Sequence, residues 1–354
     1  MKRRTYLKTI GSGAVVSLSG CAGNGDGPSN NDSSGNGDST DNEGFNNVEL
    51  RVASSFPSDL YLRQLGMVPY CEQVTEQTNG QVTFSFFPGG QLGTADSMLD
   101  IVKSGAADIV YAGPSYMSDQ LPLSTVATLP GTYQSAIEGS EAYWEITNEY
   151  LYGEELQDHN VRPLVSHTLV PHRLVTDTEI QSMSDMEGLS VRSGGGGQSL
   201  TVDALGASPV EMDGADVISS MESGVINSAI FTIPSIPSYD LDVYLDYCTT
   251  NTMMSGWSGM FLISDETYNR LNTATQDVFD TVGEEFIPQF GTSLDEEEQR
   301  VRGEISSDME FYDTNAADAF EDRYDIVYDN WASDMESRGL PGTEVLNAWL
   351  NKFD

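Results

Sequence analysis

Residues 81–112 read QVTFSFFPGGQLGTADSMLDIVKSGAADIVYA, and this stretch decides the fold class. Its first seven residues alternate between apolar and polar side chains, as a strand does. Its last six, ADIVYA, are typical of a buried strand, and residues 95–104 between them carry apolar side chains at helical spacing. A strand at 48–56 (VELRVASSF) and a helix at 61–78 precede the stretch. The order strand–helix–strand–helix–strand predicts a mostly parallel sheet and hence an α/β fold.

A second α/β unit is predicted to begin near Val161, where LVSHTLV and HRLVTDT read as strands. A strand at 189–193 (LSVRS) then leads through a run of glycines into a helix at 199–205, and SPVEM and INSAIFTI read as two further strands. From Ser264 the pattern becomes helical, including the long run 293–333. Two such units predict a two-lobed protein braced by long C-terminal helices. Its ligand cleft would lie outside the carboxyl ends of the strands.

The acidic balance excludes two classes of partner. The 354 residues include 55 acidic and 16 basic ones, which gives a formal charge of −39. A nucleic-acid-binding protein needs cationic surface to neutralise phosphates, and an anionic membrane attracts only basic patches. We therefore expect no nucleic-acid partner. Because the acidic residues are spread over the whole chain, they indicate adaptation to very high salt.

The N-terminus is predicted to be a signal peptide for export. Residues 1–21, MKRRTYLKTIGSGAVVSLSGC, combine a basic start and paired arginines with a weakly apolar stretch too short to span a membrane. They resemble a twin-arginine signal that ends in a lipobox, in which Cys21 would carry the lipid anchor. Removing the four basic residues of the signal would lower the formal charge from −39 to −43. Residues 22–46 contain mostly Gly, Asn, Asp and Ser, so we expect a flexible tether there.

The predicted organisation follows from these segments. We expect a signal peptide at 1–20, a lipidated cysteine with its tether at 21–46, and a folded body at 47–354. Within the body, lobe I is predicted at about 47–165 plus 258–297, and lobe II at about 166–257 plus 298–354. Cys71 and Cys248 fall in different predicted segments and are expected to be two buried thiols, although an exported protein could pair them.

Three stretches carry a resemblance to a known family. They are residues 87–117 (FPGGQLGTADSMLDIVKSGAADIVYAGPSYM), residues 182–193 (SMSDMEGLSVRS) and residues 204–230 (ALGASPVEMDGADVISSMESGVINSAI). In this order they resemble the solute-binding proteins of TRAP transporters, over about residues 48–290. The resemblance implies a two-lobed periplasmic-binding-protein-like fold that closes around a small organic anion, often a carboxylate. It also implies delivery of that anion to a small and a large TRAP membrane subunit.

The resemblance assigns the ligand anchor to Arg192, at the end of the strand that follows the turn at 182–188. A guanidinium binds a carboxylate bidentately and stays charged, which fits this role. The glycines after Arg192 open a helix whose N-terminal amides could also receive an anion. Some family members use a second arginine about twenty residues earlier, and that position falls on Arg173 or, without a gap, on His172.

The remaining candidates lie at strand ends that face the expected cleft. Asn227-Ser228 stands where the family usually has Asp-Gly, and apolar residues follow it, which points to a less polar pocket. The expected lining residues are Phe231, Thr232, Trp257, Ser54, Ser55, Phe56, Gln91, Tyr111, Gly113 and Ser115.

Two other functions stay open at this point. A cell-surface enzyme would need a nucleophile with its base, or a metal cluster, but the chain has no GxSxG, HExxH or P-loop motif. We therefore expect neither catalysis nor a metal or cofactor. A binding lipoprotein that serves an ATP-driven importer or a sensor would share the lobed fold, because fold does not determine partner.

Overall fold

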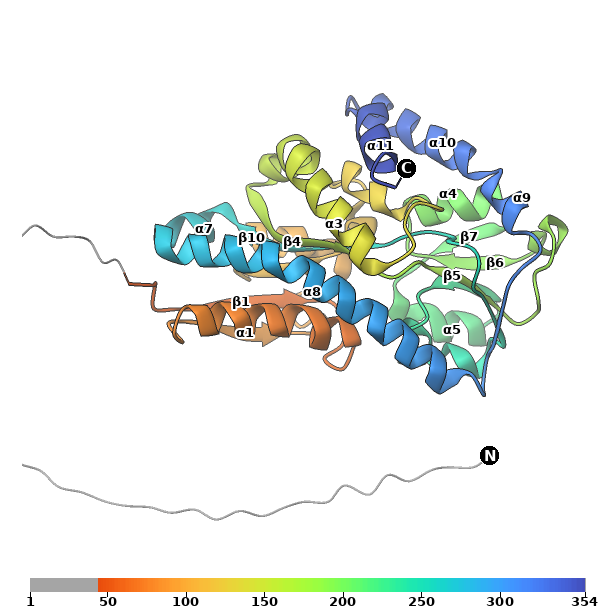
Figure 1. Ribbon diagram of the computed structural model, residues 1–354, viewed down its shortest axis with the longest axis horizontal. Helices are drawn as coiled ribbons and strands as arrows, with labels where there is room; N and C mark the ends of the chain where they lie inside the picture. The colour runs from red at the N-terminus through yellow and green to blue at the C-terminus, as the bar shows by residue number, and fades with distance from the viewer. Residues whose placement is uncertain (1–43, 354) are drawn as a thin grey trace, which may run out of the picture. The chain divides into compact units, whose positions relative to one another are not determined.

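The alternating pattern of residues 48–112 forms the parallel half of a five-stranded sheet, sheet I, in the computed structural model, which describes residues 44–353 (Figure 1). The strands lie in the order β2-β1-β3-β10-β4, with β10 antiparallel to both of its neighbours. They are β1 (Val48–Ser54), β2 (Val82–Phe87), β3 (Ile109–Ala112), β4 (Val161–Thr168) and β10 (Ser258–Ser264). The signal peptide, Cys21 and most of the tether were predicted on residues 1–43, outside the described part.

A second sheet, sheet II, has six strands in the order β11-β9-β5-β8-β6-β7. They are β5 (Arg173–Thr176), β6 (Ser190–Ser193), β7 (Ser208–Glu211), β8 (Ser228–Phe231), β9 (Tyr247–Thr249) and β11 (Glu310–Tyr312). Strand β6 is parallel to β7 and β8, whereas β5 is antiparallel to β8 and β9. Two sheets with flanking helices confirm the predicted α/β fold class.

One expectation about these sheets was wrong. Strand β4 begins at Val161 but pairs with β10 in sheet I, so the second unit begins one strand later, at β5. The apolar pattern of a strand indicates which of its faces is buried but not which strand lies beside it.

Two connecting segments run side by side between the sheets. Residues 169–172 lead from β4 to β5, and residues 250–257 return from β9 to β10. The amide of Leu169 donates to the carbonyl of Trp257 at 3.0 Å, and that of His172 donates to Ser255 at 2.9 Å. The two segments thus form a short antiparallel connection where the chain passes between sheets.

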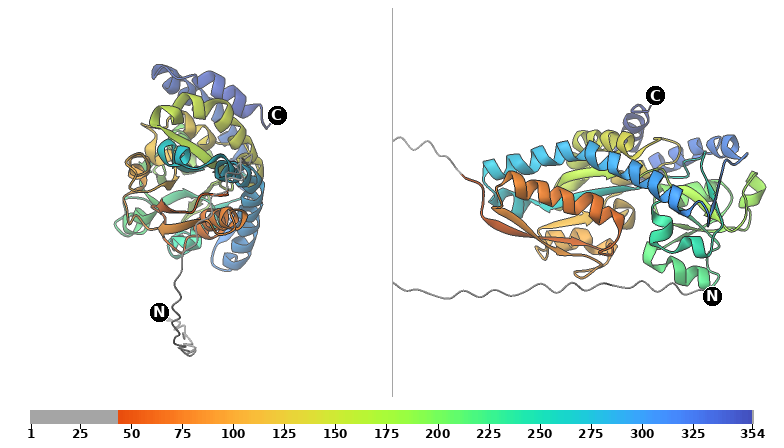
Figure 2. Two further views of the ribbon diagram at one scale, coloured as in Figure 1. Left: turned by 90° about the vertical axis from the view of Figure 1, so that its left-hand side faces the viewer. Right: turned by 60° about the horizontal axis from the view of Figure 1, so that its bottom comes forward.

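Helix α8 (Thr273–Ile305) runs along both sheets, as Figures 1 and 2 show. The side chain of Asn272 caps its start by accepting from the amide of Thr275 at 3.0 Å. Phe290 packs in the core beside sheet I, whereas Val301 packs in the core beside sheet II. This confirms the predicted long brace. The run 293–333 is not one helix, however, because α8 ends at Ile305 and strand β11 follows.

The other helices cover the sheets or close the chain. They are α1 (Val68–Gln77), α2 (Met98–Lys103), α3 (Ala136–Ile146), α4 (Gly197–Ala204), α5 (Val217–Glu222), α6 (Ser235–Ser238), α7 (Asp265–Arg270), α9 (Ala317–Glu321), α10 (Tyr324–Ser337) and α11 (Gly342–Leu350). Trp331 of α10 and Trp349 of α11 share one apolar core with Tyr143 of α3, so the chain returns to sheet I after β11. The numerical lobe boundaries stay a prediction.

Cys71 and Cys248 are both buried and unpaired, as expected. Among residues 44–353, no helix is at once long enough and apolar enough to cross a bilayer.

Candidate functional site

A small cavity lies between the two sheets, and five of its eleven lining residues are aromatic. Its volume is about 30 Å³. The residues that line it are Phe56, Leu60, Leu62, Tyr116, Leu169, His172, Arg192, Phe231, Ser235, Tyr239 and Trp257. Phe56, Leu60, Leu62 and Tyr116 come from the sheet I side, and Arg192, Phe231, Ser235 and Tyr239 from the sheet II side. Leu169, His172 and Trp257 come from the two connecting segments.

Arg192 supplies the charge of this cavity. It lies near the end of β6, is only 3% exposed, and its guanidinium stands 4.2 Å from the centre of the Phe231 ring. Its Nε and Nη2 donate to the carbonyl of Met212 at 3.2 and 3.0 Å, and its Nη1 donates to the carbonyl of Ile230 at 3.3 Å. A guanidinium has five N–H groups, so one remains on each terminal nitrogen.

Within residues 44–353, no carboxylate forms an ion pair with Arg192. The ion pairs within residues 44–353 leave it out, although most of the other arginines in this part of the chain have acidic partners. A buried charge without a counter-ion is costly unless something else supplies the opposite charge. Two free N–H groups on adjacent nitrogens match the two oxygens of one carboxylate. The arrangement is therefore suited to binding an anion.

His172 lies in the same wall and is 4% exposed. Burial, and then the charges of Arg192 and Arg173, lower the pKa of its imidazole to about 3. Its Nδ1 is buried and has no hydrogen-bond partner in the protein. At neutral pH His172 thus adds a neutral polar group to the cavity and no second charge.

Contacts between aromatic rings position the wall on each side of the cavity. The Trp257 ring meets Phe56 edge to face at 6.0 Å between centroids, and Phe231 lies 5.3 Å from Tyr239. Gly113 leaves room for the indole, since a Cβ there would lie 2.5 Å from Cζ2 of Trp257. Phe231 and Trp257, both predicted from the sequence, therefore line the cavity together.

Three predicted residues lie next to the cavity but do not line it. Tyr111 lies behind the wall, where its hydroxyl bonds to Nε2 of His167 at 2.7 Å. Thr232 is fully buried and bonds to Tyr61 and Ser235. Ser115 is buried, and its hydroxyl has no partner. Their contact with a ligand stays a prediction.

Arg173, Ser55 and Gln91 lie outside the cavity lining. Nη1 of Arg173 donates to the carbonyl of Thr252 at 2.6 Å. Burial lowers the pKa of Arg173, while the charge of Glu298 on α8 raises it. Gln91 is exposed and Ser55 is half-buried. Their contact with a ligand also stays a prediction.

Two backbone amides of the glycine run, residues 194–197, donate hydrogen bonds to other protein groups. The amide of Gly194 donates to Oε1 of Gln198 at 2.7 Å, and that of Gly197 donates to Oγ1 of Thr128 at 2.9 Å. A Cβ at Gly197 would lie 2.6 Å from the same Oγ1, so this glycine permits close contact between the lobes. The start of α4 is therefore a contact between the two sides.

Sequence reasoning missed several lining residues, namely Leu60, Leu62, Tyr116, Leu169, Ser235 and Tyr239. Tyr116 directly follows the predicted Ser115, so strand-end position indicated the right segment but the wrong side chain. Tyr239 lies in a turn after α6, where no sequence pattern pointed to a site.

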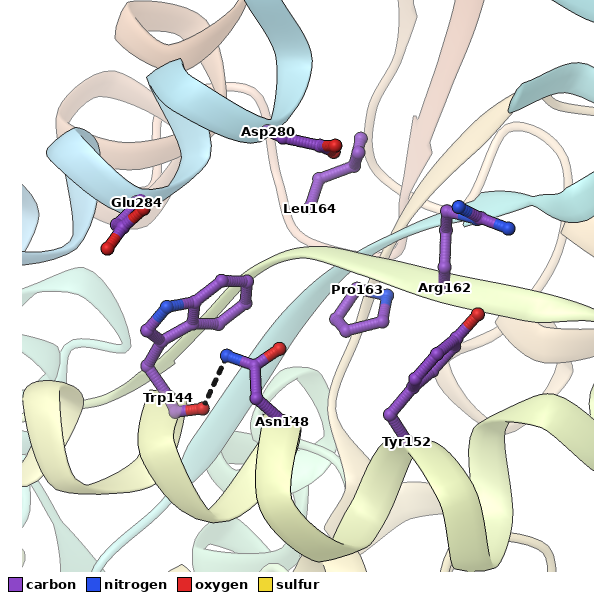
Figure 3. A pocket seen from close by; sticks show the side chains of 8 residues that line it. All are labelled: Trp144, Asn148, Tyr152, Arg162, Pro163, Leu164, Asp280 and Glu284. Atoms are coloured by element: carbon purple, nitrogen blue, oxygen red, sulfur yellow. Dashed lines mark hydrogen bonds between the residues drawn. The ribbon is translucent and has the colours of Figure 1, made fainter. Parts of the chain in front are cut away.

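A larger hollow of about 370 Å³ lies on the outer side of sheet I, between α3 and α8 (Figure 3). Its one basic residue, Arg162, is already paired with Asp265 at 2.8 Å. Asp280 and Glu284 line the same hollow and would repel an anion. The hollow therefore has greater volume, but the cavity at Arg192 has the chemistry of an anion site.

Comparison with known proteins shows which family the sequence matches. Residues 53–334 match DctP, described as bacterial extracellular solute-binding protein, family 7. A solute-binding protein of Roseobacter denitrificans is 24% identical over 215 residues, which are 60% of this chain. That alignment spans 65% of the relative, slightly less than two thirds of its length.

Solved structures share the fold at low sequence identity. A TRAP solute-binding protein from a marine metagenome, specific for aromatic acids and crystallised with 3-hydroxybenzoate, is 22% identical with a TM-score of 0.81. The match covers 87% of this chain and 99% of that one. A TRAP solute-binding protein of Rhodoferax ferrireducens, in complex with benzoate, is 20% identical with a TM-score of 0.80 and coverages of 86% and 97%. At these identities the likeness is one of fold.

Proposed function

The chain belongs to the DctP family, family 7 of the bacterial extracellular solute-binding proteins, and on this basis we propose that it captures a small aromatic carboxylate. It then delivers this anion to the small and large membrane subunits of a TRAP-type secondary transporter. The protein acts by binding and release and performs no chemistry on its ligand.

The observation that carries this proposal is the unpaired, buried guanidinium of Arg192 inside an aromatic wall. The free N–H on each terminal nitrogen donates to one oxygen of the carboxylate, and the ligand's charge replaces the missing counter-ion. Trp257, Phe231 and Tyr116 enclose the ring, for which edge-to-face contacts are favourable. The solved neighbours that hold benzoate and 3-hydroxybenzoate support this ligand class.

The other predicted residues have supporting roles in this proposal. Arg173 adds positive potential from β5, which is separated from the strand of Arg192 by β8. Ser115 offers its unpartnered hydroxyl when the lobes rearrange around a ligand. Thr232 and Tyr111 hold the wall from behind. Ser55 and Gln91 lie on the approach to the cleft.

Capture requires the two lobes to separate. A cavity of about 30 Å³ has room for little more than water, whose share of liquid volume is also about 30 Å³. A benzoate needs several times that space, so we propose that a hinge motion at the connecting segments opens the cavity and closes it again. The two moving bodies would be built on sheet I and on sheet II, with α10 and α11 packed on the sheet I side.

Calorimetric titration in molar salt tests the proposal with four probes. Benzoate should bind, benzamide should fail because it lacks the charge, and cyclohexanecarboxylate and acetate should bind more weakly because they lack the aromatic ring. Losing two hydrogen bonds to a charged group costs about 3–6 kcal/mol, so Arg192→Met should weaken benzoate binding by about 100-fold or more. Arg323→Met, at an exposed arginine, is the matched control and should change nothing. Equal affinity of the wild type for benzoate and benzamide would contradict the carboxylate anchor.

We also propose that the protein is exported and anchored to the outer face of the cytoplasmic membrane through a lipid on Cys21. Its acidic balance would suit a haloarchaeal source and folding in strong salt, where the Debye length is about 3 Å at 1 M. Mass spectrometry of the membrane-extracted protein tests the anchor. An unmodified Cys21 would contradict it. Unfolding in low and molar KCl tests the salt adaptation, which predicts a higher midpoint in molar KCl.

A further inference from the structure

Three hydroxyl groups meet between the lobes, beside the cavity. The hydroxyl of Tyr61 lies 3.2 Å from Oγ1 of Thr232 and 3.4 Å from Oγ of Ser235. The two latter oxygens are 2.8 Å apart. Each hydroxyl can donate one hydrogen bond and accept others, so the three form a closed triangle.

This triangle joins the two sides of the molecule. Tyr61 packs in the apolar core beside sheet I, just before the helical turn η1 (Arg63–Met67). Thr232 and Ser235 follow β8 of sheet II, where Ile233 and Ile236 belong to the core on that side. Opening of the cleft would therefore separate Tyr61 from its two partners.

All three side chains are buried in this arrangement. Burial raises the pKa of Tyr61 to about 12, so its hydroxyl keeps its proton at any physiological pH. Ser235 also lines the cavity, so the triangle borders the space that a ligand would fill. The bonds between the lobes are thus shielded from water while the cleft is closed.

We infer that Tyr61 is a positioning residue that holds the lobes shut around a bound solute through Thr232 and Ser235. This inference rests on the proposed function, since it assumes that release requires opening. Bonds that form only after closure should slow dissociation and leave association unchanged. Tyr61→Phe removes only the hydroxyl and keeps the packed ring.

The decisive measurement is the dissociation rate of benzoate by stopped-flow fluorescence, for which Trp257 in the cavity wall is the reporter. Two neutral hydrogen bonds of ordinary strength correspond to roughly a tenfold change. We expect Tyr61→Phe to dissociate about tenfold faster at an unchanged association rate. Thr232→Val leaves the bond between Tyr61 and Ser235, so it should accelerate dissociation by less than Tyr61→Phe does. The double variant should be no faster than Tyr61→Phe alone, and Thr232→Ser should keep the slow rate.

Tyr143→Phe is the matched control. Its hydroxyl is also buried and donates to the carbonyl of Ser124 at 2.8 Å. Tyr143 and Leu123, the neighbour of Ser124, lie in one core beside sheet I, so this bond does not join the two lobes. It should leave the dissociation rate unchanged. A Tyr61→Phe rate within twofold of wild type, or an equal change in Tyr143→Phe, would overturn the inference.

Failure of the proposed ligand class would be visible separately, as absence of benzoate binding by the wild type. The unfolding equilibria of Tyr61→Phe, Thr232→Val and the double variant then decide. Each single variant should raise the equilibrium constant of unfolding. The rise in the double variant should be at least threefold smaller than the product of the two single rises. Independent, multiplicative effects would overturn the inference.

Discussion

Replacing Gly113 by alanine tests how the cavity wall is positioned. The backbone of Gly113 has φ −106° and ψ 105°, which alanine adopts freely, so the substitution changes only the space around Cβ. That Cβ would lie 2.5 Å from Cζ2 of Trp257 and 3.1 Å from Cδ2 of Tyr116. Carbon atoms in contact prefer about 3.5–4.0 Å, so the indole must move by about 1 Å.

The consequences follow from where the two rings lie. Trp257 and Tyr116 both line the cavity, and overpacking of this kind costs about 1–3 kcal/mol of stability. Because the ring positions change, we also expect benzoate affinity to fall by about tenfold or more. Urea unfolding measures the first effect and calorimetric titration the second.

Two further variants show whether the effect comes from the contact between Gly113 and Trp257. At Gly153, in the helical segment η5 (Thr147–Leu156), nothing lies within 4 Å of an added Cβ. Gly153→Ala should therefore raise stability by about 0.5–1 kcal/mol, as alanine does in a helix, and leave affinity unchanged. Trp257→Phe removes the atoms that collide, so the pair Gly113→Ala/Trp257→Phe should be less destabilised than the sum of the single variants. Gly113→Ala with wild-type stability and affinity would refute the reasoning about the wall.

Three further predictions concern titration and thiol chemistry. The pKa of His172 is about 3 in the folded protein and about 6.5 in the unfolded chain, so the unfolded chain takes up the proton first as pH falls. The free energy of unfolding should therefore fall as pH drops from about 6.5 toward 3. His172→Phe should flatten this pH dependence, measured by urea unfolding. Burial raises the pKa of Glu155 to about 7, although the hydroxyl of Ser124 and the amides of Leu123 and Ser124 donate to it. Its contribution to stability should therefore fall as pH rises from about 4.5 to 7, and an unchanged pH slope in Glu155→Gln would contradict this. Burial raises the pKa of the Cys248 thiol to about 12 and that of the Cys71 thiol well above its ordinary value. Both thiols should therefore resist alkylation by iodoacetamide until the protein unfolds. Rapid labelling of the native protein, detected by mass spectrometry, would contradict this.

Local patterns predicted most of the secondary structure. Residues 48–112 alternate at strand and helix periods, and the sheet they form follows directly. Arg192 was indicated by the family resemblance, which its position near a strand end before a glycine run supports. Phe231 was indicated by the apolar residues that replace polar ones after Asn227-Ser228, and Trp257 by the small residues that flank it.

Residues that depend on distant partners were not predictable in this way. Tyr116 and Tyr239 line one cavity although 123 positions separate them in the sequence. Gln91 and Ser55 follow strands as the other candidates do, yet neither side chain lines the cavity. Thr232 lies at the right place in the sequence, but its hydroxyl is bound to Tyr61.

The sequence alone determined the α/β class and the acidic composition and indicated Arg192 as the candidate anchor, because these depend on composition, on local patterns and on a family resemblance. Only the tertiary structure decided that β4 belongs to sheet I, that Trp257 fits against Gly113, and that Tyr61 meets Thr232 between the lobes. Those contacts join segments far apart in the chain. Side-chain volume and packing direction select them, and the local apolar pattern contains neither.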